Sequence, residues 1–153
     1  MEVWRICRRA HATDPLSGKG GLVTGGRWQA RGTRVVYTSS SLSLAALEVL
    51  VHASATELPS DLVQVQVHIP DDLLIEEIAV SSLPKNWREY PAPASLQAIG
   101  AEWLGSMRTA VLKVPSAVIP SESNYLINPV QDDSQRIQAA RAEKFILDPR
   151  LNR

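Results

Sequence analysis

The sequence lacks the features that tie a small protein to a membrane or hold it together with disulfides. One cysteine, Cys7, stands among 153 residues, so no disulfide can form within the chain and a reducing compartment is expected. Cys7 lies in the run WRIC, which is typical of an inert core thiol. No apolar run approaches the ~20 residues of a membrane span, and the first residues show no signal peptide. We therefore expect a cytoplasmic protein with no membrane partner.

A surplus of one charge is also missing. The 16 lysines and arginines balance 16 aspartates and glutamates. Proteins that bind nucleic acid directly, or attach to anionic membranes, usually carry a basic excess, so neither class is expected. Hydrophobic residues make up 44% and charged residues 21% of the chain, which is ordinary for a soluble globular protein. The length predicts a single domain, residues 1–153, that buries a core without metal or disulfide.

The hydrophobic pattern predicts an α+β fold with a mainly antiparallel sheet and a few helices. Residues 62–69 alternate between apolar and polar side chains, which is typical of an antiparallel strand with one wet face. Residues 122–129, ESNYLINP, are expected to form a loop or short turn. We also expect strands at 3–7, 34–38, 72–80 and 143–147, two short strand pieces within 110–120, helices at 42–53 and 94–107, and a loop of about 25 residues between the first two strands.

The helix expected at 42–53 is apolar on nearly every face, which predicts a buried helix, and the serines before it can cap its N-terminus. Glu48 is its only formal charge, and a lone carboxylate there is costly unless it is paired or hydrogen-bonded. Glu48 is either structural, paired with an arginine or turned to water, or functional, held in an apolar cleft to meet developing positive charge. His52 lies four residues later on the same face, but two ligands do not make a metal site, so no metal is expected.

Glycine and positive charge are concentrated in one stretch, GKGGLVTGGRWQARGTRVVY. Five of the 8 glycines fall between Gly18 and Gly26, and Arg27 follows them directly. Neither the P-loop pattern nor the GxGxxG dinucleotide fingerprint is present. Glycines let a ligand approach bare backbone N–H groups, and the planar fork of an arginine suits a diphosphate. The alternative is a flexible loop with solvated arginines.

Three further polar residues are candidates for ligand contacts. Tyr37 ends the second expected strand, where its ring either stacks on a planar heterocycle or packs in the core. Ser116 stands between two prolines that fix its backbone, and its hydroxyl can contact a ligand. No general base lies beside it in the sequence, so a serine nucleophile is not supported. Asn124 follows shortly afterwards.

Several sequence blocks occur in an order that resembles one known family. The order is similar to that of the RES domain, a family named for Arg, Glu and Ser positions that match Arg27, Glu48 and Ser116 here. The resemblance extends from residues 4–6 to residues 148–151, nearly the whole chain. The blocks are WRI (4–6), GGRW (25–28), VVYTS (35–39), ALEVLVH (46–52), LPKNW (83–87), IGAEWL (99–104), VPSAVIPSESNYLINP (114–129) and FILDPRL (145–151).

This resemblance implies the toxin of a bacterial toxin–antitoxin pair, which forms a hetero-oligomer with an Xre-like helix-turn-helix antitoxin. It implies a fold similar to that of ADP-ribosyltransferase toxins. Members consume NAD, as a substrate rather than a cofactor, by hydrolysis or phosphorolysis, and at least one kind modifies a protein. The catalytic roles would fall on Arg27, Tyr37, Glu48 and Ser116. The implied NAD-binding set is Gly26, Arg27, Trp28, Tyr37, Ser116 and Asn124.

Each of these roles has a chemical reason. Cleavage of the nicotinamide–ribose bond passes through an oxocarbenium-like state, which a carboxylate in an apolar setting stabilises, and this role falls to Glu48. Arg27 would clamp the diphosphate, and Tyr37 would stack on the nicotinamide side. Ser116 would hold the nicotinamide ribose or its amide.

The sequence departs from the family pattern in two places. Gln29 stands where many members have asparagine, and VQDD follows LINP where many have a histidine-containing stretch. A third observation concerns the acceptor. Ala46 stands two residues before Glu48, where the protein-modifying transferase toxins carry a second glutamate, and this favours water or phosphate as acceptor. A mono-ADP-ribosyltransferase that acts on a protein and a non-catalytic NAD-binding module remain as alternatives.

Overall fold

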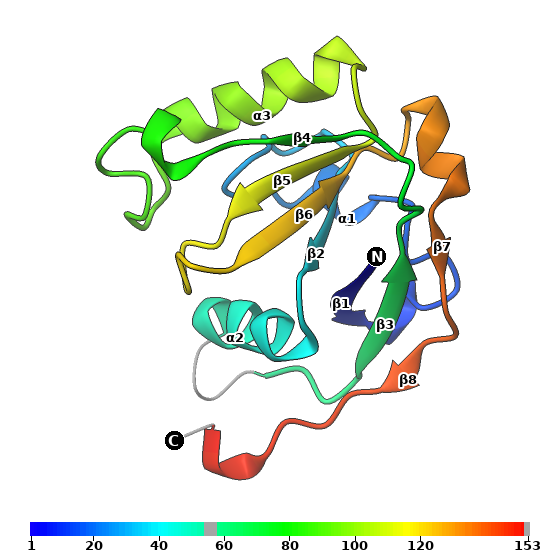
Figure 1. The fold of residues 1–153 in the computed structure, drawn as a ribbon. Coiled ribbons are helices and arrows are strands. Elements are labelled where there is room, and N and C mark those ends of the chain that lie inside the picture. The colour runs from blue at the N-terminus through cyan, green and yellow to red at the C-terminus, as the bar shows by residue number, and fades with distance from the viewer. Residues whose placement is uncertain (54–57, 152–153) are drawn as a thin grey trace.

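The computed structural model describes residues 1–53 and 58–151 (Figure 1). In these ranges three helices and eight strands form a mixed α+β fold. The helices are α1 (Gly20–Val23), α2 (Leu42–His52) and α3 (Ala94–Ser106). The strands are β1 (Glu2–Arg8), β2 (Val36–Ser39), β3 (Leu62–His68), β4 (Ile75–Glu77), β5 (Val111–Pro115), β6 (Ser123–Ile127), β7 (Gln138–Ala139) and β8 (Glu143–Lys144). None of the described helices is both long and apolar enough to cross a membrane.

The strands form one sheet in the order β4-β5-β6-β2-β1-β3-β7, and β8 also pairs with β3. Only β4 and β5 run parallel, so the expectation of a mainly antiparallel sheet is confirmed. Strands β1 and β2 meet at one residue pair, Trp4 with Ser39, whereas β1 pairs with β3 along its whole length. The sheet therefore bends at this point into two halves, which Figure 1 shows on either side of the β1–β2 junction.

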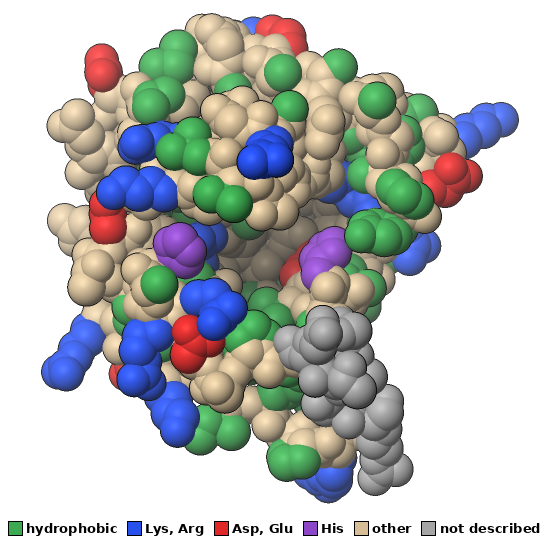
Figure 2. Space-filling view, turned by 180° about the vertical axis from the view of Figure 1, so that it is seen from behind, with side chains coloured by type: hydrophobic (Ala, Val, Ile, Leu, Met, Phe, Trp, Pro, Cys, Tyr) green, Lys and Arg blue, Asp and Glu red, His purple; other side chains and the backbone are tan. Residues whose placement is uncertain are grey.

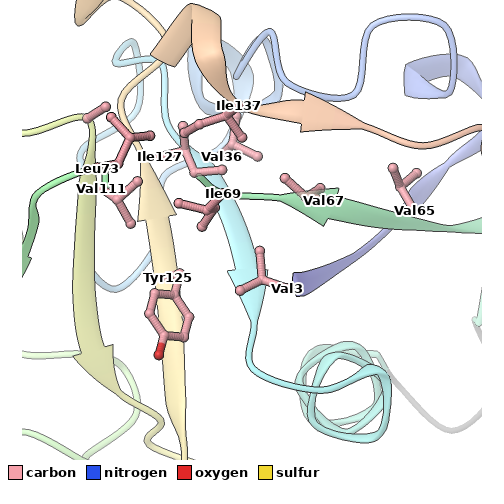
Figure 3. Packing of buried hydrophobic residues seen from close by; sticks show 11 residues of the cluster. Val3, Val36, Val65, Val67, Ile69, Leu73, Val111, Tyr125, Ile127 and Ile137 are labelled. Atoms are coloured by element: carbon pink, nitrogen blue, oxygen red, sulfur yellow. The ribbon is translucent and has the colours of Figure 1, made fainter. Parts of the chain in front are cut away.

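One core lies between the two halves of the sheet (Figure 3). Side chains from β2, β5 and β6 meet side chains from β1 and β3 there. Full burial of such aliphatic side chains contributes about 1.5–3 kcal/mol each to the stability of the fold. The labelled members are Val3, Val36, Val65, Val67, Ile69, Leu73, Val111, Tyr125, Ile127 and Ile137.

A second core lies on the opposite face of β2, β5 and β6, where α3 covers the sheet (Figure 1). Three tryptophans, Trp28, Trp87 and Trp103, fill it together with leucines and valines from the sheet and α3. Gly100 allows α3 to approach closely, because a Cβ atom at this position would lie 1.7 Å from the carbonyl oxygen of Trp28. The segment that carries Arg27 is therefore clamped between α3 and the sheet.

The elements with the most regular patterns lie where the sequence predicted them. The helices expected at 42–53 and 94–107 and the strands expected at 3–7 and 62–69 are α2, α3, β1 and β3. Ser41 caps α2, since its side chain accepts a hydrogen bond of 3.1 Å from the N–H of Leu44. These segments form as predicted because their patterns are local.

Other predictions about strands and loops were wrong. Residues 122–129 are not a loop, because they contain β6, which pairs with β2 on one side and β5 on the other. The second strand piece expected within 110–120 is absent, since the chain turns after Pro115. The strands expected at 34–38, 72–80 and 143–147 shorten to β2, β4 and β8, and the glycine loop contains the short helix α1.

The prediction that the helix at 42–53, now α2, is a buried helix was also wrong for part of its surface. Leu44 and Ala45 are buried, but Leu47 and Val51 are 38% and 59% exposed. The helix contacts β1 and β2 with one side only, at the end of the sheet, so its other apolar side faces outward.

Candidate functional site

The carboxylate of Glu48 is held by two side chains from the sheet. Its Oε1 atom accepts a hydrogen bond of 2.8 Å from Ser116 Oγ and one of 2.6 Å from Asn124 Nδ2. Helix α2 follows β2 directly, which brings Glu48 to the end of β5 and β6 where these two partners lie. No salt bridge within the described residues includes Glu48, so the structural alternative of an ion pair with an arginine does not apply.

Both partners of Glu48 are themselves fixed, so their protons must point at it. Ser39 pairs with Asn124 across β2 and β6, and its hydroxyl donates to Asn124 Oδ1 at 2.8 Å. The amide of Asn124 therefore presents its NH₂ group to the carboxylate. The hydroxyl oxygen of Ser116 accepts the N–H groups of Val118 and Ile119 at 3.1 and 3.0 Å, which leaves its own proton for Glu48.

The hydroxyl of Ser116, which is predicted to contact a ligand, is held within the protein. Its side chain is 0% exposed, and its hydroxyl is fully used by Glu48 and by two backbone N–H groups. We place Ser116 behind Glu48, where it orients the carboxylate.

The guanidinium of Arg27 is anchored on one side and open on the other. Its Nη1 atom donates to the carbonyl oxygens of Trp87 and Glu89 at 2.6 and 3.1 Å. Its Nε and Nη2 atoms have no hydrogen-bond partner among the described residues. Burial lowers the pKa of Arg27, while the nearby Glu48 and Tyr37 act in the opposite direction. The cation and the carboxylate are therefore within electrostatic reach of each other without forming an ion pair.

Tyr37 is tied by its hydroxyl to the segment that carries Arg27. The hydroxyl donates to Gln29 Oε1 at 2.6 Å and accepts the N–H of Trp28 at 3.3 Å. Burial raises the pKa of this hydroxyl well above its usual range. Gly26 is required at this point, because a Cβ atom there would lie 2.5 Å from Tyr37 Oη. The ring of Tyr37 is partly buried and packs against the second core, and its contact with a ligand stays a prediction.

Two glutamines that sequence reasoning did not place in the site hold this segment in shape. Gln29 is 2% exposed, and its Nε2 atom donates to Thr24 O at 3.0 Å. Gln97 on α3 donates to the carbonyls of Gly26 and Gln29 at 2.9 and 3.2 Å. The departure from the family pattern at position 29 was the only sequence signal, and Gln97 gave none.

The predicted residues thus gather in two groups, and Arg27 in one group lies within electrostatic reach of Glu48 in the other. Glu48, Ser116 and Asn124 form one group, and Arg27 with Tyr37 and Gly26 forms the other. Trp28 joins the second group only through its N–H, since its indole lies in the second core. Figure 2 shows the molecule hollowed across the middle of one face, with a histidine and an acidic side chain together on the rim of the hollow. The described residues contain no cluster of His, Cys, Asp and Glu that could hold a metal ion.

Known proteins resemble this chain over nearly its whole length. Residues 2–148 match the RES domain. A protein of Sphingobium sp. named Prs ADP-ribosylating toxin is 41% identical over 98% of this chain and 96% of its own length. A Yersinia enterocolitica protein named Toxin Res is 37% identical over 99% of both chains.

The fold is also found in a solved structure. The crystal structure of the M.tuberculosis MbcT–MbcA toxin–antitoxin complex contains a chain that matches with a TM-score of 0.76 and 17% identity, over 99% of this chain and 86% of that one. The predicted α+β fold is therefore confirmed. The name of the Sphingobium relative fits the predicted likeness of this fold to that of ADP-ribosyltransferase toxins. This chain belongs to the RES domain family.

Proposed function

We propose that this protein is the toxin of a toxin–antitoxin pair and that it depletes NAD by cleaving the nicotinamide–ribose bond. The observation that carries the proposal is the Glu48 carboxylate, which is held by Ser116 and Asn124 within electrostatic reach of Arg27 and forms no ion pair with it. The names of the relatives support it, since two are toxins and one is ADP-ribosylating. ADP-ribosyl transfer and NAD hydrolysis begin with cleavage of the same bond.

Glu48 acts on the sugar. When the C–N bond breaks, its electron pair leaves with the nicotinamide, which becomes neutral, and positive charge develops on the ribose. Two donors hold Oε1, so the carboxylate of Glu48 stays in one orientation. Its Oε2 atom has no hydrogen-bond partner among the described residues. A fixed carboxylate in a partly buried site stabilises the developing cation without having to reorganise. Water or phosphate then adds to the ribose carbon and gives up its proton.

Arg27 holds the diphosphate. Its Nη1 is occupied by the carbonyls of Trp87 and Glu89, so Nε and Nη2 are left as a two-donor fork for phosphate oxygens. Gly26 lets the segment that carries this fork pack against the Tyr37 hydroxyl. We propose that the ring of Tyr37, which is only partly buried, contacts the nicotinamide side of the ligand. NAD is the substrate here, and no resident cofactor is needed for this step.

The partner we propose is an Xre-like helix-turn-helix antitoxin, in a hetero-oligomer formed in the cytoplasm. A solved structure with the same fold is a toxin–antitoxin complex, which supports an antitoxin partner. We propose neither a nucleic-acid nor a membrane partner, in line with the balanced charge of the chain.

A second candidate function is transfer of ADP-ribose to a protein. The observation that favours it is the name of the 41% identical relative, Prs ADP-ribosylating toxin. Against it stands Ala46, two residues before Glu48, where protein-modifying toxins carry a second glutamate. A third reading, an NAD-binding module without turnover, predicts binding alone.

Expression in a bacterial host without an antitoxin tests the proposed function. We expect growth to stop and extracted NAD to fall, and we expect neither with Glu48→Gln or Arg27→Ala. Co-expression of a helix-turn-helix antitoxin should restore both. Growth arrest at a normal NAD content, with ADP-ribose on a host protein, would favour the transferase. Normal growth and normal NAD with soluble wild-type protein would contradict a toxin role.

A further inference from the structure

One loop connects the two groups of the candidate site. Residues 84–93, here called the strap, follow a short 3₁₀ turn at Val80–Ser82 and lead into α3. Trp87 anchors the strap in the second core, and the carbonyls of Trp87 and Glu89 accept the hydrogen bonds from Arg27. Arg88 donates from Nε to Ala117 O at 3.0 Å, next to the residue that orients Glu48. The base of the strap is therefore fixed to both sides of the site.

The tip of the strap carries an exposed aromatic ring. Tyr90 is 80% exposed, and its hydroxyl makes no hydrogen bond to any described residue. The ring lies against the imidazole of His52, with 6.1 Å between centroids and 54° between planes. His52 lies four residues after Glu48, about 6 Å along the same face of α2. A ring from the strap and a ring from α2 thus meet about one helical turn from Glu48.

A purely structural role does not explain Tyr90. A ring that stabilises the fold is normally buried and its hydroxyl is normally paired, and Tyr90 shows neither property. Its contact with His52 does not fix it in place either, because the ring faces solvent on its other sides. The Tyr90 ring can swing outward at little cost while Trp87 keeps the base of the strap in position.

We propose that Tyr90 and His52 form an aromatic clamp that takes a heteroaromatic ring of the dinucleotide. The proposal rests on the proposed NAD site. Once the diphosphate is bound at Arg27, the inserted ring displaces Tyr90 from His52 and stacks between them. The strap then acts on the ligand in two ways, directly through Tyr90 and indirectly through the carbonyls that hold Arg27. The ring is either the adenine or the nicotinamide, and both offer a planar face for stacking.

Calorimetric binding of an uncleavable NAD analogue, with a carbocyclic nicotinamide ribose, tests the clamp on wild-type protein. Loss of one stacked aromatic by Tyr90→Ala should raise Kd by about 5- to 150-fold. Tyr90→Phe and His52→Phe keep a ring and should stay within about 2-fold of wild type. Leu74→Ala removes another exposed side chain outside the site and should leave Kd unchanged. Because Tyr90 is exposed, the melting temperature of Tyr90→Ala should match that of wild type.

The outcomes separate the clamp from the proposed function. Wild-type binding with an unchanged Kd in Tyr90→Ala or His52→Ala overturns the clamp and leaves the NAD site standing. Failure of folded wild-type protein to bind the analogue overturns both. The same variants tested with ADP-ribose and with nicotinamide mononucleotide identify the ring. A loss with ADP-ribose places adenine in the clamp, and a loss with the mononucleotide places nicotinamide there.

Discussion

The substitution Glu48→Gln separates the charge of the carboxylate from its position. Glutamine has the same shape, and its side-chain oxygen can accept the bonds from Ser116 and Asn124 that Oε1 accepts now. Its NH₂ group then takes the place of Oε2, which has no partner among the described residues. The substitution therefore removes the negative charge while the site keeps its shape.

The expected effects on activity and on stability differ enough to be told apart. Removal of one preorganised electrostatic group costs about 100- to 1,000-fold in kcat, or ~3–4 kcal/mol. Two charge-assisted hydrogen bonds become neutral ones, which lowers the free energy of unfolding by about 2–3 kcal/mol at most. The lower cost of burying an amide offsets part of that loss. Even a domain whose free energy of unfolding is only ~5 kcal/mol would then remain more than about 90% folded. Unfolding therefore cannot account for a 100-fold loss of kcat.

Nicotinamide release from NAD at 25 °C measures the effect, with Glu143→Gln as the control. Glu143 lies on β8 and is exposed, so the same chemical change there should leave kcat unaltered. Circular dichroism checks that both variants are folded. Parental kcat in Glu48→Gln would refute the reasoning, because it would show that the charge at position 48 does not act on the transition state.

Three further predictions concern the shape of the site. Gly100→Ala should lower the free energy of unfolding, measured by urea titration, by about 1–3 kcal/mol or more, because the new Cβ meets the Trp28 carbonyl. A Cβ at Gly105 on the same helix meets nothing within 4 Å, so Gly105→Ala should raise the free energy of unfolding slightly. Equal effects of the two substitutions would contradict the close approach of α3. Ser116→Ala should cost at least about 1–3 kcal/mol, since it leaves two backbone N–H groups unpaired, and a change below about 0.5 kcal/mol would rule that out. Burial raises the pKa of Tyr37, so the folded state holds the phenol proton more tightly than the unfolded state does. The contribution of the protonated Tyr37 to the free energy of unfolding is therefore complete below pH ~10 and is lost as the pH rises further. Tyr37→Phe should remove this alkaline loss and the matching tyrosinate absorbance step, and an unchanged titration would contradict it.

The parts of the fold that the sequence predicted are those with local patterns. The alternation in 62–69 and the helical runs at 42–53 and 94–107 carry their own periodicity, so β3, α2 and α3 could be recognised without knowledge of their neighbours. Strand β6 carries no such pattern. It is a strand because β2 and β5, distant in sequence, pair with both of its edges.

The candidate site divides in the same way. Arg27 and Glu48 could be named because charge beside glycine and a lone carboxylate in an apolar helix are visible in the sequence. The carbonyls that hold Arg27 could not be predicted from the sequence, because every residue has a carbonyl and only the fold selects those of Trp87 and Glu89. Chain folding likewise brings Tyr90 to His52, and no local sequence pattern predicts that contact.

The most direct test is proton and phosphorus NMR of purified wild-type protein with NAD, free of antitoxin, in buffers with and without phosphate. We predict release of nicotinamide, which Glu48→Gln should reduce by about 100-fold or more. Release in both buffers, with ADP-ribose as the product, would identify hydrolysis. Release only with phosphate, with a new phosphorus resonance, would identify phosphorolysis. Folded protein that leaves NAD intact in both buffers would contradict the assignment of NAD cleavage to this site.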